Sequence, residues 1–430
     1  MAIALVVAIV ALLILPSVST SRTLLDHHDA QTGFQVTLKH VDSGGNLTKF
    51  ELLQRAMKRG KKRIQSLYAM ALAASDSSIE SPIHAGNGEF LMELSIGTPP
   101  TTYSAILDTG SDLIWTQCQP CKHCFNQPTP IFDPAKSSSF SKLPCSSDLC
   151  TALPMSSCSG GNCEYLYTYG DYSSTQGVMA TETLTFGKVS IPKVGFGCGL
   201  HNEGSGFNQG GGLVGLGRGP LSLVSQLDEP KFSYCLTSID PTESSTLMMG
   251  SYASVNSTTQ NTTPLIKSPS SPSFYYLSLE AITVGDTVLP IKKSTFSLKD
   301  DGSGGMIIDS GTTITYLEES AFELIKNEFT NQVKLPVDES NESGLDLCFK
   351  LPPNDQNIEV PKLIFHFEGA DLDLPGENYI IVDPSGVACL AMGGSSGMSI
   401  FGNFQQQNIQ VLHDLNKETL SFVPRKCDQL

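Results

Sequence analysis

Two short stretches of this 430-residue chain, about two hundred positions apart, carry the side chains best suited to chemistry. Residues 105–111 read AILDTGS and residues 306–312 read MIIDSGT, so each apolar run ends in Asp, a hydroxyl residue, Gly and a second hydroxyl residue. Such a pattern predicts a buried strand entering a tight turn, in which glycine lets the backbone fold beneath the carboxylate. Because a buried carboxylate is costly unless hydroxyl and amide groups satisfy it, Asp108 and Asp309 indicate an acid/base pair.

An ordinary turn is the alternative explanation for these motifs. One match to Asp, Ser/Thr, Gly, Ser/Thr is expected roughly 0.02 times in a chain of this length at average residue usage. A single match would be explained equally well by an Asx-type turn. Two matches, each preceded by an apolar strand, favour a pair of related sites.

The chain around these motifs shows mostly strand signals. Apolar and polar residues alternate between turn signals at residues 90–96, 163–169, 178–186, 274–279, 363–367 and 409–413. Beyond residue 80, helical spacing is confined to short pieces, mainly residues 318–332. We therefore predict an all-β fold, mainly β with a few short helices, in a chain long enough for two or three domains.

The first twenty residues predict a secretory signal peptide. They carry no charge, and an apolar run over residues 2–15 is followed by Pro and small residues. An N-terminal membrane anchor is the alternative, but the run is short for a membrane span. No later stretch is long or apolar enough to cross a bilayer, so we expect no stable membrane anchor.

Residues 21–80 differ in charge from the rest of the chain. They hold nine Lys and Arg against six Asp and Glu, so they carry +3 within a chain of −16, and residues 81–430 carry −19. Residues 34–41 alternate like a strand, and residues 47–72 place apolar side chains at helical spacing beside a basic cluster. One interpretation is an amphipathic helix on a membrane or a partner. The charge asymmetry favours a basic propeptide lying across an acidic enzyme.

All twelve cysteines follow the first Asp motif, and an even number in a secreted chain predicts six disulfides. They are Cys118, Cys121, Cys124, Cys145, Cys150, Cys158, Cys163, Cys198, Cys235, Cys348, Cys389 and Cys427. The closely spaced Cys118, Cys121 and Cys124, with His123 among them, are also compatible with metal binding. In an oxidising compartment the disulfide interpretation is favoured, and no His-Glu-x-x-His zinc helix occurs. We therefore expect no metal and no cofactor.

The acidic composition favours work in acid and excludes nucleic acid as a partner. The excess negative charges of residues 81–430 repel one another at neutral pH, and protonation of surface carboxylates near pH 4 relieves that repulsion. The pI is about 4.9. Acceptor sequences for N-glycosylation occur at Asn46, Asn256, Asn261 and Asn341.

The two Asp motifs resemble the catalytic motifs of the pepsin-like aspartic endopeptidases, and the resemblance extends over residues 85–430. Residues 95–99 are similar to the strand before the first motif, and residues 169–171 look like the tip of the flap. The cysteine cluster at residues 118–163 resembles the insertion of the nepenthesin-like plant branch. The resemblance implies a bilobal fold with the active-site cleft between the lobes. It divides the chain into signal peptide 1–20, propeptide 21–80, N-terminal lobe 81–240 and C-terminal lobe 241–430.

The resemblance also implies a role for each motif residue. Asp108 and Asp309 would be the catalytic dyad, and the dyad would be supported by Thr109, Gly110, Ser111, Ser310, Gly311 and Thr312. Tyr169 and Gly170 would cover the substrate from the flap, with Trp115 beside the tyrosine. Apolar–apolar–Gly strands at residues 213–215 and 400–402 would thread behind the two Asp turns.

These roles predict a secreted, monomeric, pepstatin-sensitive endopeptidase that hydrolyses proteins at acidic pH and is made as a zymogen. Its partners would be protein or peptide substrates and its own propeptide as intramolecular inhibitor, and the vacuole is the alternative location. The rival functions are a secreted binding or inhibitor protein on the same fold and a cysteine-rich metal-binding glycoprotein. The first usually lacks an active-site Asp or the flap Tyr, which this chain retains.

Two finer expectations also follow from the resemblance. Lys39 would reach toward the dyad from the propeptide, whose other basic residues would add attraction to the acidic body. The disulfides would join Cys118–Cys121, Cys124–Cys198, Cys145–Cys163, Cys150–Cys158, Cys235–Cys427 and Cys348–Cys389.

Overall fold

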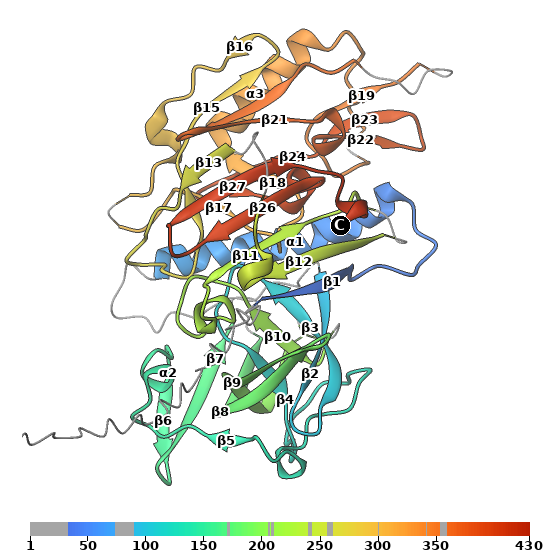
Figure 1. Ribbon diagram of the computed structural model, residues 1–430. Helices are drawn as coiled ribbons and strands as arrows, with labels where there is room; N and C mark the ends of the chain where they lie inside the picture. The colour runs from blue at the N-terminus through green and yellow to red at the C-terminus, as the bar shows by residue number, and fades with distance from the viewer. Residues whose placement is uncertain are drawn as a thin grey trace, which may run out of the picture. The chain divides into compact units, whose positions relative to one another are not determined.

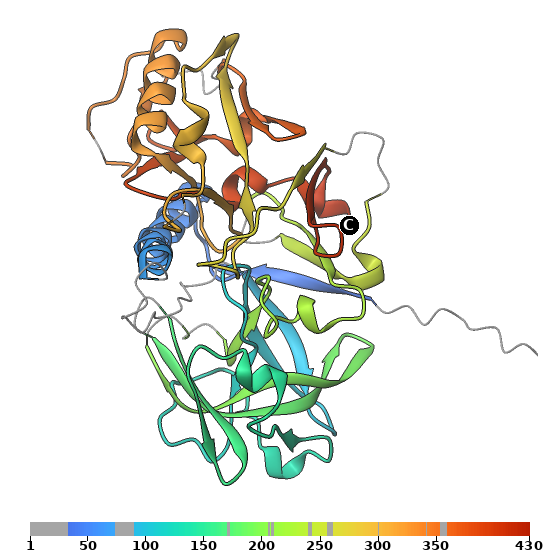
Figure 2. The ribbon, with the colours of Figure 1, turned by 90° about the vertical axis from the view of Figure 1, so that its left-hand side faces the viewer.

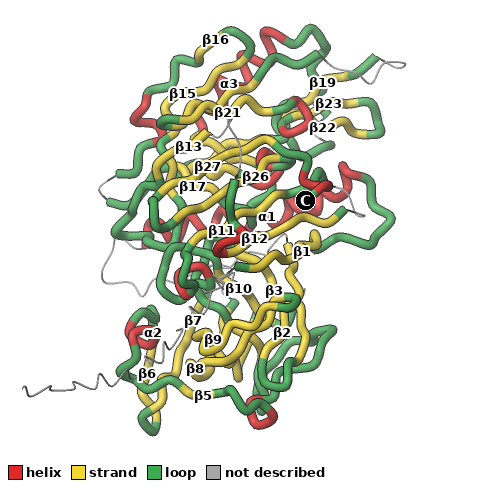
Figure 3. The backbone as a smooth tube through the Cα atoms, in the orientation of Figure 1, coloured by secondary structure: helices red, strands yellow, loops and turns green. Residues whose placement is uncertain are grey.

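The computed structural model describes residues 33–73, 90–169, 173–204, 207, 210–239, 243–255, 261–299, 301–340, 342–352 and 359–430. Within these ranges the chain is mostly strand, as the yellow tube of Figure 3 makes plain. The three α-helices among the described residues are α1 (Lys49–Ala73), α2 (Asp148–Thr151) and α3 (Glu319–Gln332). The predicted fold class, mainly β with few short helices, is confirmed.

The largest sheet has 15 strands among the described residues and runs through both halves of the chain. Its order is β13-β27-β26-β11-β12-β1-β2-β3-β10-β4-β9-β8-β7-β6, with β5 paired to β8. Its strands are β1 (Phe34–His40), β2 (Phe90–Ile96), β3 (Thr101–Asp108), β4 (Trp115–Gln117), β5 (Ser141–Lys142), β6 (Ser156–Ser159), β7 (Asn162–Thr168), β8 (Ser174–Phe186), β9 (Val189–Glu203), β10 (Gly212–Gly215), β11 (Lys231–Cys235), β12 (Ser244–Met249), β13 (Asn261–Pro264), β26 (Ile409–Asp414) and β27 (Thr419–Pro424).

In the described part of the C-terminal half, three smaller sheets are present. The first contains β14 (Tyr276–Leu277), β17 (Met306–Ile308), β25 (Ser399–Phe401), β18 (Thr315–Glu318) and β24 (Met392–Ser395). The second contains β16 (Thr287–Val288), β15 (Leu279–Val284), β20 (Leu363–Phe367) and β21 (Ala370–Leu374). The third contains β19 (Cys348–Lys350), β23 (Val387–Leu390) and β22 (Ile380–Asp383).

The two Asp motifs lie at the ends of related strand arrangements, one in each half. β10 runs parallel to β3 and places Gly215 opposite Asp108. β25 runs parallel to β17 and places Phe401 opposite Ile308, the residue before Asp309. The predicted strands behind the two turns are therefore present, and each half presents its Asp at the end of a buried strand.

The N-terminal segment belongs to the same body as these sheets. β1 lies between β12 and β2, with Phe34, Val36 and Leu38 buried and the alternate side chains exposed. Helix α1 begins with a capping box, because the hydroxyl of Thr48 accepts from the backbone N–H of Glu51 and the carboxylate of Glu51 accepts from the N–H of Thr48. In Figure 1, α1 lies between two groups of strands: those numbered up to β10 are on one side of it, and β15 to β24 are on the other. Figure 2 shows the same helix nearly end-on between these groups.

One face of α1 is apolar and packs against the C-terminal half. Phe50, Leu53 and Met57 join one buried cluster with Ile314 and Phe404. Leu67 joins a second cluster, which includes Phe274, Tyr276, Ile307, Met398 and Ile400. The apolar face of the predicted amphipathic helix is therefore covered by this chain itself. Of the helices in the described ranges, none has the length and apolarity that a membrane span requires.

The twelve cysteines form six disulfides, as the even count predicted, but four of the six expected pairings are wrong. Cys235–Cys427 and Cys348–Cys389 are confirmed. The other pairs are Cys118–Cys198, Cys121–Cys124, Cys145–Cys158 and Cys150–Cys163.

Strand pairing and burial decide the four corrected pairs. β4 runs parallel to β9, and the N–H of Cys118 donates to the carbonyl of Gly199, so Cys118 lies next to Cys198. Cys121 and Cys124 are left to bond each other. In the insertion, α2 presents Cys150 to the same buried cluster as Cys163, while the more exposed Cys145 and Cys158 pair outside it.

The buried His413 in β26 gives the fold a dependence on pH. Its ring is 1 % exposed, stacks on Phe232 at 4.3 Å and meets Tyr275 edge-on at 4.6 Å. Burial lowers the pKa of His413 to about 3, and the charge of Arg218 adds to this against a backbone hydrogen bond to Val411. The unfolded chain takes up a proton near the ordinary value of 6.5, so His413 lowers stability as pH falls from about 6.5 to about 3.

Replacing His413 with Phe should therefore remove part of the loss of stability in acid. At 1.36 kcal/mol for each pH unit, the protonation penalty grows to roughly 4–5 kcal/mol at pH 3. Thermal unfolding followed between pH 7 and pH 3 should show the variant gaining on the wild type as pH falls. His123→Gln, at an exposed histidine, is the control and should track the wild type. Identical pH slopes for His413→Phe and the wild type would contradict the assignment.

Candidate active site

The side chain of Arg63, from the middle of α1, joins the two motif aspartates. Its Nη2 lies 2.6 Å from Oδ1 of Asp108 and 2.8 Å from Oδ1 of Asp309, and its Nε lies 2.6 Å from Oδ2 of Asp309. All three side chains are buried, with exposures of 0–1 %. The structure therefore brings Asp108 and Asp309 together on a single guanidinium.

Each carboxylate is held by its own turn in the same way. Asp108 accepts from the N–H of Gly110 at 3.0 Å and from the hydroxyl of Ser111 at 2.6 Å. Asp309 accepts from Gly311 at 3.0 Å and from Thr312 at 2.6 Å. Hydroxyl and amide donors thus satisfy both buried carboxylates, as the motif pattern predicted.

The two turns also contact each other through their hydroxyl residues. The hydroxyl oxygens of Thr109 and Ser310 lie 3.2 Å apart, and the backbone N–H of Ser310 donates to Thr109 at 3.1 Å. Thr109 donates in turn to Oδ1 of Asp309 at 3.1 Å. The expected cross-brace is present, and it fixes one Asp turn against the other.

Gly110 and Gly311, which have no side chains, leave the space between the two carboxylates that the guanidinium of Arg63 occupies. A Cβ atom on Gly110 would lie 2.6 Å from Nη2 of Arg63, and one on Gly311 would lie 2.5 Å from its Cζ. Both contacts are far shorter than van der Waals distance. The same space would be open to small groups of other kinds if the guanidinium were withdrawn.

The electrostatics of this site favour the charged forms of Arg63 and Asp309. Burial opposes the charge on Arg63, but Asp108 and Asp309 outweigh it and raise the pKa of the guanidinium further. Burial likewise raises the pKa of Asp309, while the charge and hydrogen bonds of Arg63, with those from Thr312 and Gly311, lower it to below its ordinary value. Nη1 of Arg63 has no hydrogen-bond partner among the described residues, so the two aspartates hold the guanidinium by one edge, through Nε and Nη2.

Sequence reasoning missed Arg63 and assigned its place to Lys39, which is wrong. The side chain of Lys39 is exposed, because it lies on the face of β1 opposite to the buried Phe34, Val36 and Leu38. Arg63 instead lies on the apolar stripe of α1, between Met57 and Leu67. In the sequence, Arg63 could have been identified as a basic residue at a position that helical spacing assigns to the apolar face of α1.

The expected attraction between several basic residues and the acidic body is largely absent from the described side chains. Arg59 and Arg55 pair with Asp42, in the turn before α1, at 2.8 and 3.9 Å. Lys58 and Lys61 are exposed, and among the described ion pairs of α1 only those of Arg63 reach beyond residue 73. Among the described side chains of α1, the buried cation Arg63 and an apolar face make the contact with the body.

The predicted flap residues lie beside the first motif. Nε1 of Trp115 donates to the hydroxyl of Tyr169 at 2.7 Å, and both side chains are fully buried. The ring of Phe207 packs edge-on against both, at 4.7 and 5.2 Å. Burial raises the pKa of Tyr169, with smaller contributions from neighbouring groups, so it stays a neutral hydroxyl. Gly170 lies outside the described residues.

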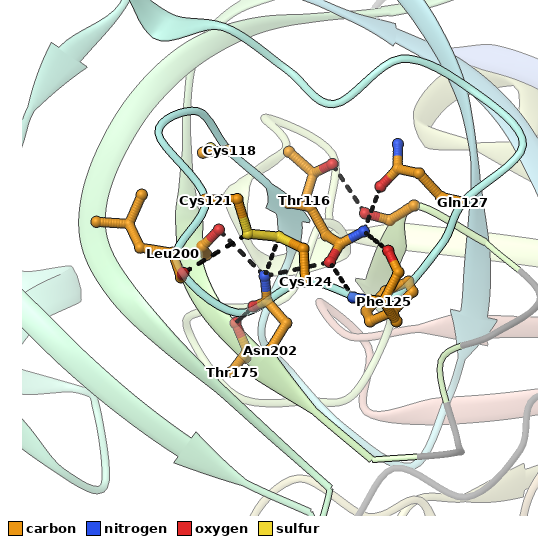
Figure 4. Close-up of a disulfide and its surroundings, with 12 residues drawn as sticks. Thr116, Cys118, Cys121, Cys124, Phe125, Gln127, Thr175, Leu200 and Asn202 are labelled. Carbon is orange, nitrogen blue, oxygen red and sulfur yellow. Dashed lines mark hydrogen bonds between the residues drawn. A yellow bond between two sulfur atoms is a disulfide. The ribbon is translucent and has the colours of Figure 1, made fainter.

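The cysteine-rich loop that follows Trp115 is held by hydrogen bonds around the Cys121–Cys124 disulfide (Figure 4). The amide of Gln117 exchanges hydrogen bonds with the backbone of Phe125, at 3.0 and 3.1 Å. Asn202 of β9 accepts from Thr175 at 2.7 Å and lies next to the sulfur of Cys124. Phe125, which follows the Cys121–Cys124 disulfide, meets Trp115 edge-on at 6.3 Å.

The candidate glycosylation sites are only partly within the described residues. Asn46 is exposed just before α1. Asn261 lies in β13, where its amide donates to the carbonyl of Asp371 at 2.7 Å. Asn256 and Asn341 lie outside the described residues.

Comparison with known proteins agrees with this geometry. Two family models match, described as xylanase inhibitor N-terminal over residues 90–251 and xylanase inhibitor C-terminal over residues 274–424. Among solved structures, edgp is similar with a TM-score of 0.65 at 17% identity, covering 92% of this chain and 95% of that one. Basic 7S globulin from soybean has a TM-score of 0.61 at 21% identity, covering 79% and 94%. At these identities the likeness shows the fold alone.

Two relatives from the plant Nepenthes gracilis are much more similar in sequence. Aspartic proteinase nepenthesin-1 is 55% identical over 428 residues, which is 98% of this chain and 97% of that protein. Aspartic proteinase nepenthesin-2 is 52% identical over 425 residues, which is 98% and 97% of the two chains. With the two Asp turns facing each other across one site, these likenesses show that the chain belongs to the nepenthesin-like family of plant aspartic proteases.

Proposed function

We propose that this protein is a secreted endopeptidase that hydrolyses peptide bonds of proteins in acid, with Asp108 and Asp309 as its catalytic dyad. The observation that carries the proposal is the convergence of both carboxylates on one group, within 2.6–2.8 Å of Arg63. Each carboxylate has its own hydroxyl and amide donors, so the two are fixed in space before any substrate arrives. Fixed acid and base groups are what general acid–base catalysis needs.

In the active form, a water molecule takes the space that the guanidinium fills. Two neighbouring carboxylates cannot both ionise cheaply in acid, so the pair holds one proton between them. The ionised Asp removes a proton from the water molecule, and the water oxygen attacks the carbon of the peptide carbonyl group. At the same time the protonated Asp donates its proton to the carbonyl oxygen. The resulting diol collapses, the C–N bond breaks, and the amine leaves with a proton. Tyr169 and Gly170 close over the peptide from the flap, with Trp115 holding the tyrosine.

The chain is made in a latent form, in which residues 21–80 act as a propeptide after a signal peptide at residues 1–20. The proposal is supported by α1, which seats Arg63 on the dyad and covers apolar side chains on both sides of it. While Arg63 is in place, neither water nor a peptide carbonyl has room at the carboxylates. The lobes of the active enzyme are residues 81–240 and 241–430, and the enzyme works as a monomer in extracellular fluid or the vacuole.

An inhibitor without catalytic activity is the second candidate, because the matching family models are named for xylanase inhibitors. Such a protein has no need of two intact Asp turns. Both turns are complete here, and the 55% identity to an aspartic proteinase also favours the enzyme. The discriminating experiment is hydrolysis of denatured haemoglobin at pH 3 by the acid-treated full chain, with and without pepstatin. We expect pepstatin-sensitive hydrolysis, and inactive, correctly folded protein would overturn the proposal.

A further inference from the structure

A third carboxylate, Asp112, lies buried behind the first Asp turn. Its exposure is 8 %, and no ion pair reaches it within the described part of the chain. The second turn has Thr313 at the matching position, beside Gly60 of α1, so the arrangement at Asp112 has no counterpart in the other half. A buried carboxylate without a cation is expensive, and its retention requires a reason.

The surroundings of Asp112 are shaped to hold its carboxyl group. Its Oδ1 accepts from the backbone N–H of Gly219 at 2.9 Å, and its Oδ2 accepts from the hydroxyl of Ser273. A Cβ atom on Gly217 would lie 2.2 Å from Oδ1, and one on Gly219 would lie 2.1 Å from Oδ2. Only glycine at both positions leaves space for the carboxyl group.

Through these contacts Asp112 joins three segments. The backbone of residues 216–219 bonds the first turn at Asp108 and Ser111, at 2.7 and 2.8 Å. Ser273 precedes β14, which pairs with β17, the strand that ends one residue before Asp309. The N–H of Ile308 donates to the carbonyl of Tyr275 at 3.0 Å. A short path of bonds therefore runs behind the two Asp turns from Asp108 to Asp309, and the Asp112–Ser273 hydrogen bond is one link in it.

We propose that Asp112 is a positioning residue that, with Ser273, fixes Asp108 relative to Asp309 from behind the dyad. The inference rests on the proposed function, because it concerns the geometry of the same reaction. A displacement of about 1 Å at a catalytic group can lower turnover about a hundredfold. The Thr109–Ser310 contact braces the turns at the front, and Asp112–Ser273 braces them at the back.

The link holds whether Asp112 is charged or neutral. Burial raises the pKa of Asp112, the donors Ser273 and Gly219 oppose this, and the charge of Asp108 adds to it. Burial raises the pKa of the neighbouring Tyr167 and Tyr275, the charge of Asp112 adds to this, and the charge of Arg218 opposes it at Tyr275. A neutral carboxyl group donates its proton to Ser273 and still accepts from Gly219, so the link survives in acid. Asn has the same donor and acceptor arrangement.

The test compares Asp112→Ala, Asp112→Asn and Ser273→Ala in the full chain after acid activation, with active sites counted by pepstatin titration. We expect Asp112→Ala and Ser273→Ala to lower kcat by about 10- to 100-fold with KM within about threefold. Asp112→Asn should restore kcat to within about threefold of the wild type. Ser225→Ala, whose hydroxyl contacts the carbonyl of Arg218 instead, is the matched control and should not change kcat.

The outcomes separate this inference from the proposed function. An inactive wild type would refute the proposed function, whatever the activities of the variants. An active wild type with unchanged kcat in Ser273→Ala and Asp112→Ala would overturn the positioning role alone. If Asp112→Ala fails to fold, Ser273→Ala decides, because it removes only one hydroxyl and leaves the buried carboxyl group in place. A low kcat in both Asp112→Ala and Asp112→Asn would also contradict the positioning role.

Discussion

Asp108→Asn and Asp309→Asn should each abolish hydrolysis, with kcat/KM at least about 10³-fold lower than in the wild type. Asn keeps an oxygen to accept from Gly110 or Gly311, so the turn should retain its shape. It can neither take a proton from water nor donate a carboxyl proton. The measurement is hydrolysis of denatured haemoglobin at pH 3, with the variants processed by added wild-type enzyme that is then removed.

Glu339→Gln is the control for these variants, because it neutralises an exposed carboxylate. It should leave activity unchanged. Thermal unfolding at neutral pH should show that the Asn variants are folded, although the precursor should open more easily because Arg63 has lost one of its ionic partners. Substantial activity in either processed variant would refute the dyad.

Arg63→Met should release the precursor from latency at a higher pH than the wild type. The substitution keeps an unbranched side chain on the apolar face of α1 but removes the cation from two buried carboxylates. Breaking a buried ion pair costs about 3–5 kcal/mol, which corresponds to a shift of about 10²- to 5 × 10³-fold between the closed and open forms. The measurement is the onset of processing, followed by gel electrophoresis from pH 7 to pH 3.

The direction of this pH dependence follows from the carboxylate. The pKa of Asp309 is lowered in the closed form, because the charge and hydrogen bonds of Arg63 outweigh the effect of burial. The stabilisation is therefore present at neutral pH and is lost as pH falls through the lowered value. The pKa of Arg63 is raised, so the guanidinium keeps its charge throughout and the titration of Asp309 sets the pH dependence.

Three further variants sharpen the experiment. Lys61→Met and Lys39→Met remove exposed charges from the same segment and should leave the processing threshold unchanged. Arg63→Lys keeps the charge but loses the fork that contacts both carboxylates, and should lie between the wild type and Arg63→Met. If Arg63→Met processes like the wild type, the apolar face of α1 and the pairing of β1 are sufficient for latency.

The local pattern of the sequence determined most of the secondary structure. Residues 90–96 and 363–367 show strand-like alternation and form β2 and β20 with the expected bounds, and the apolar stripe in residues 47–72 forms part of α1. The Asp turns were equally predictable, because apolar runs that stop at Asp-hydroxyl-Gly leave the backbone few alternatives. The alternation of β1 also determined the outward direction of Lys39, although the resemblance had suggested otherwise.

Tertiary structure decided which distant groups meet. Cys118 could bond several neighbours in sequence, and only the parallel pairing of β4 with β9 placed it beside Cys198. Likewise, α1 carries several basic residues within two turns, and successive residues differ by about 100° in direction. The docking of its apolar face selected Arg63 for the dyad and left Lys58 and Lys61 in solvent. The partner of Asp112 depended in the same way on how β14 approaches residues 216–219. Local periodicity fixes the direction of a side chain within its own element, whereas its partner is fixed only when buried faces pack together.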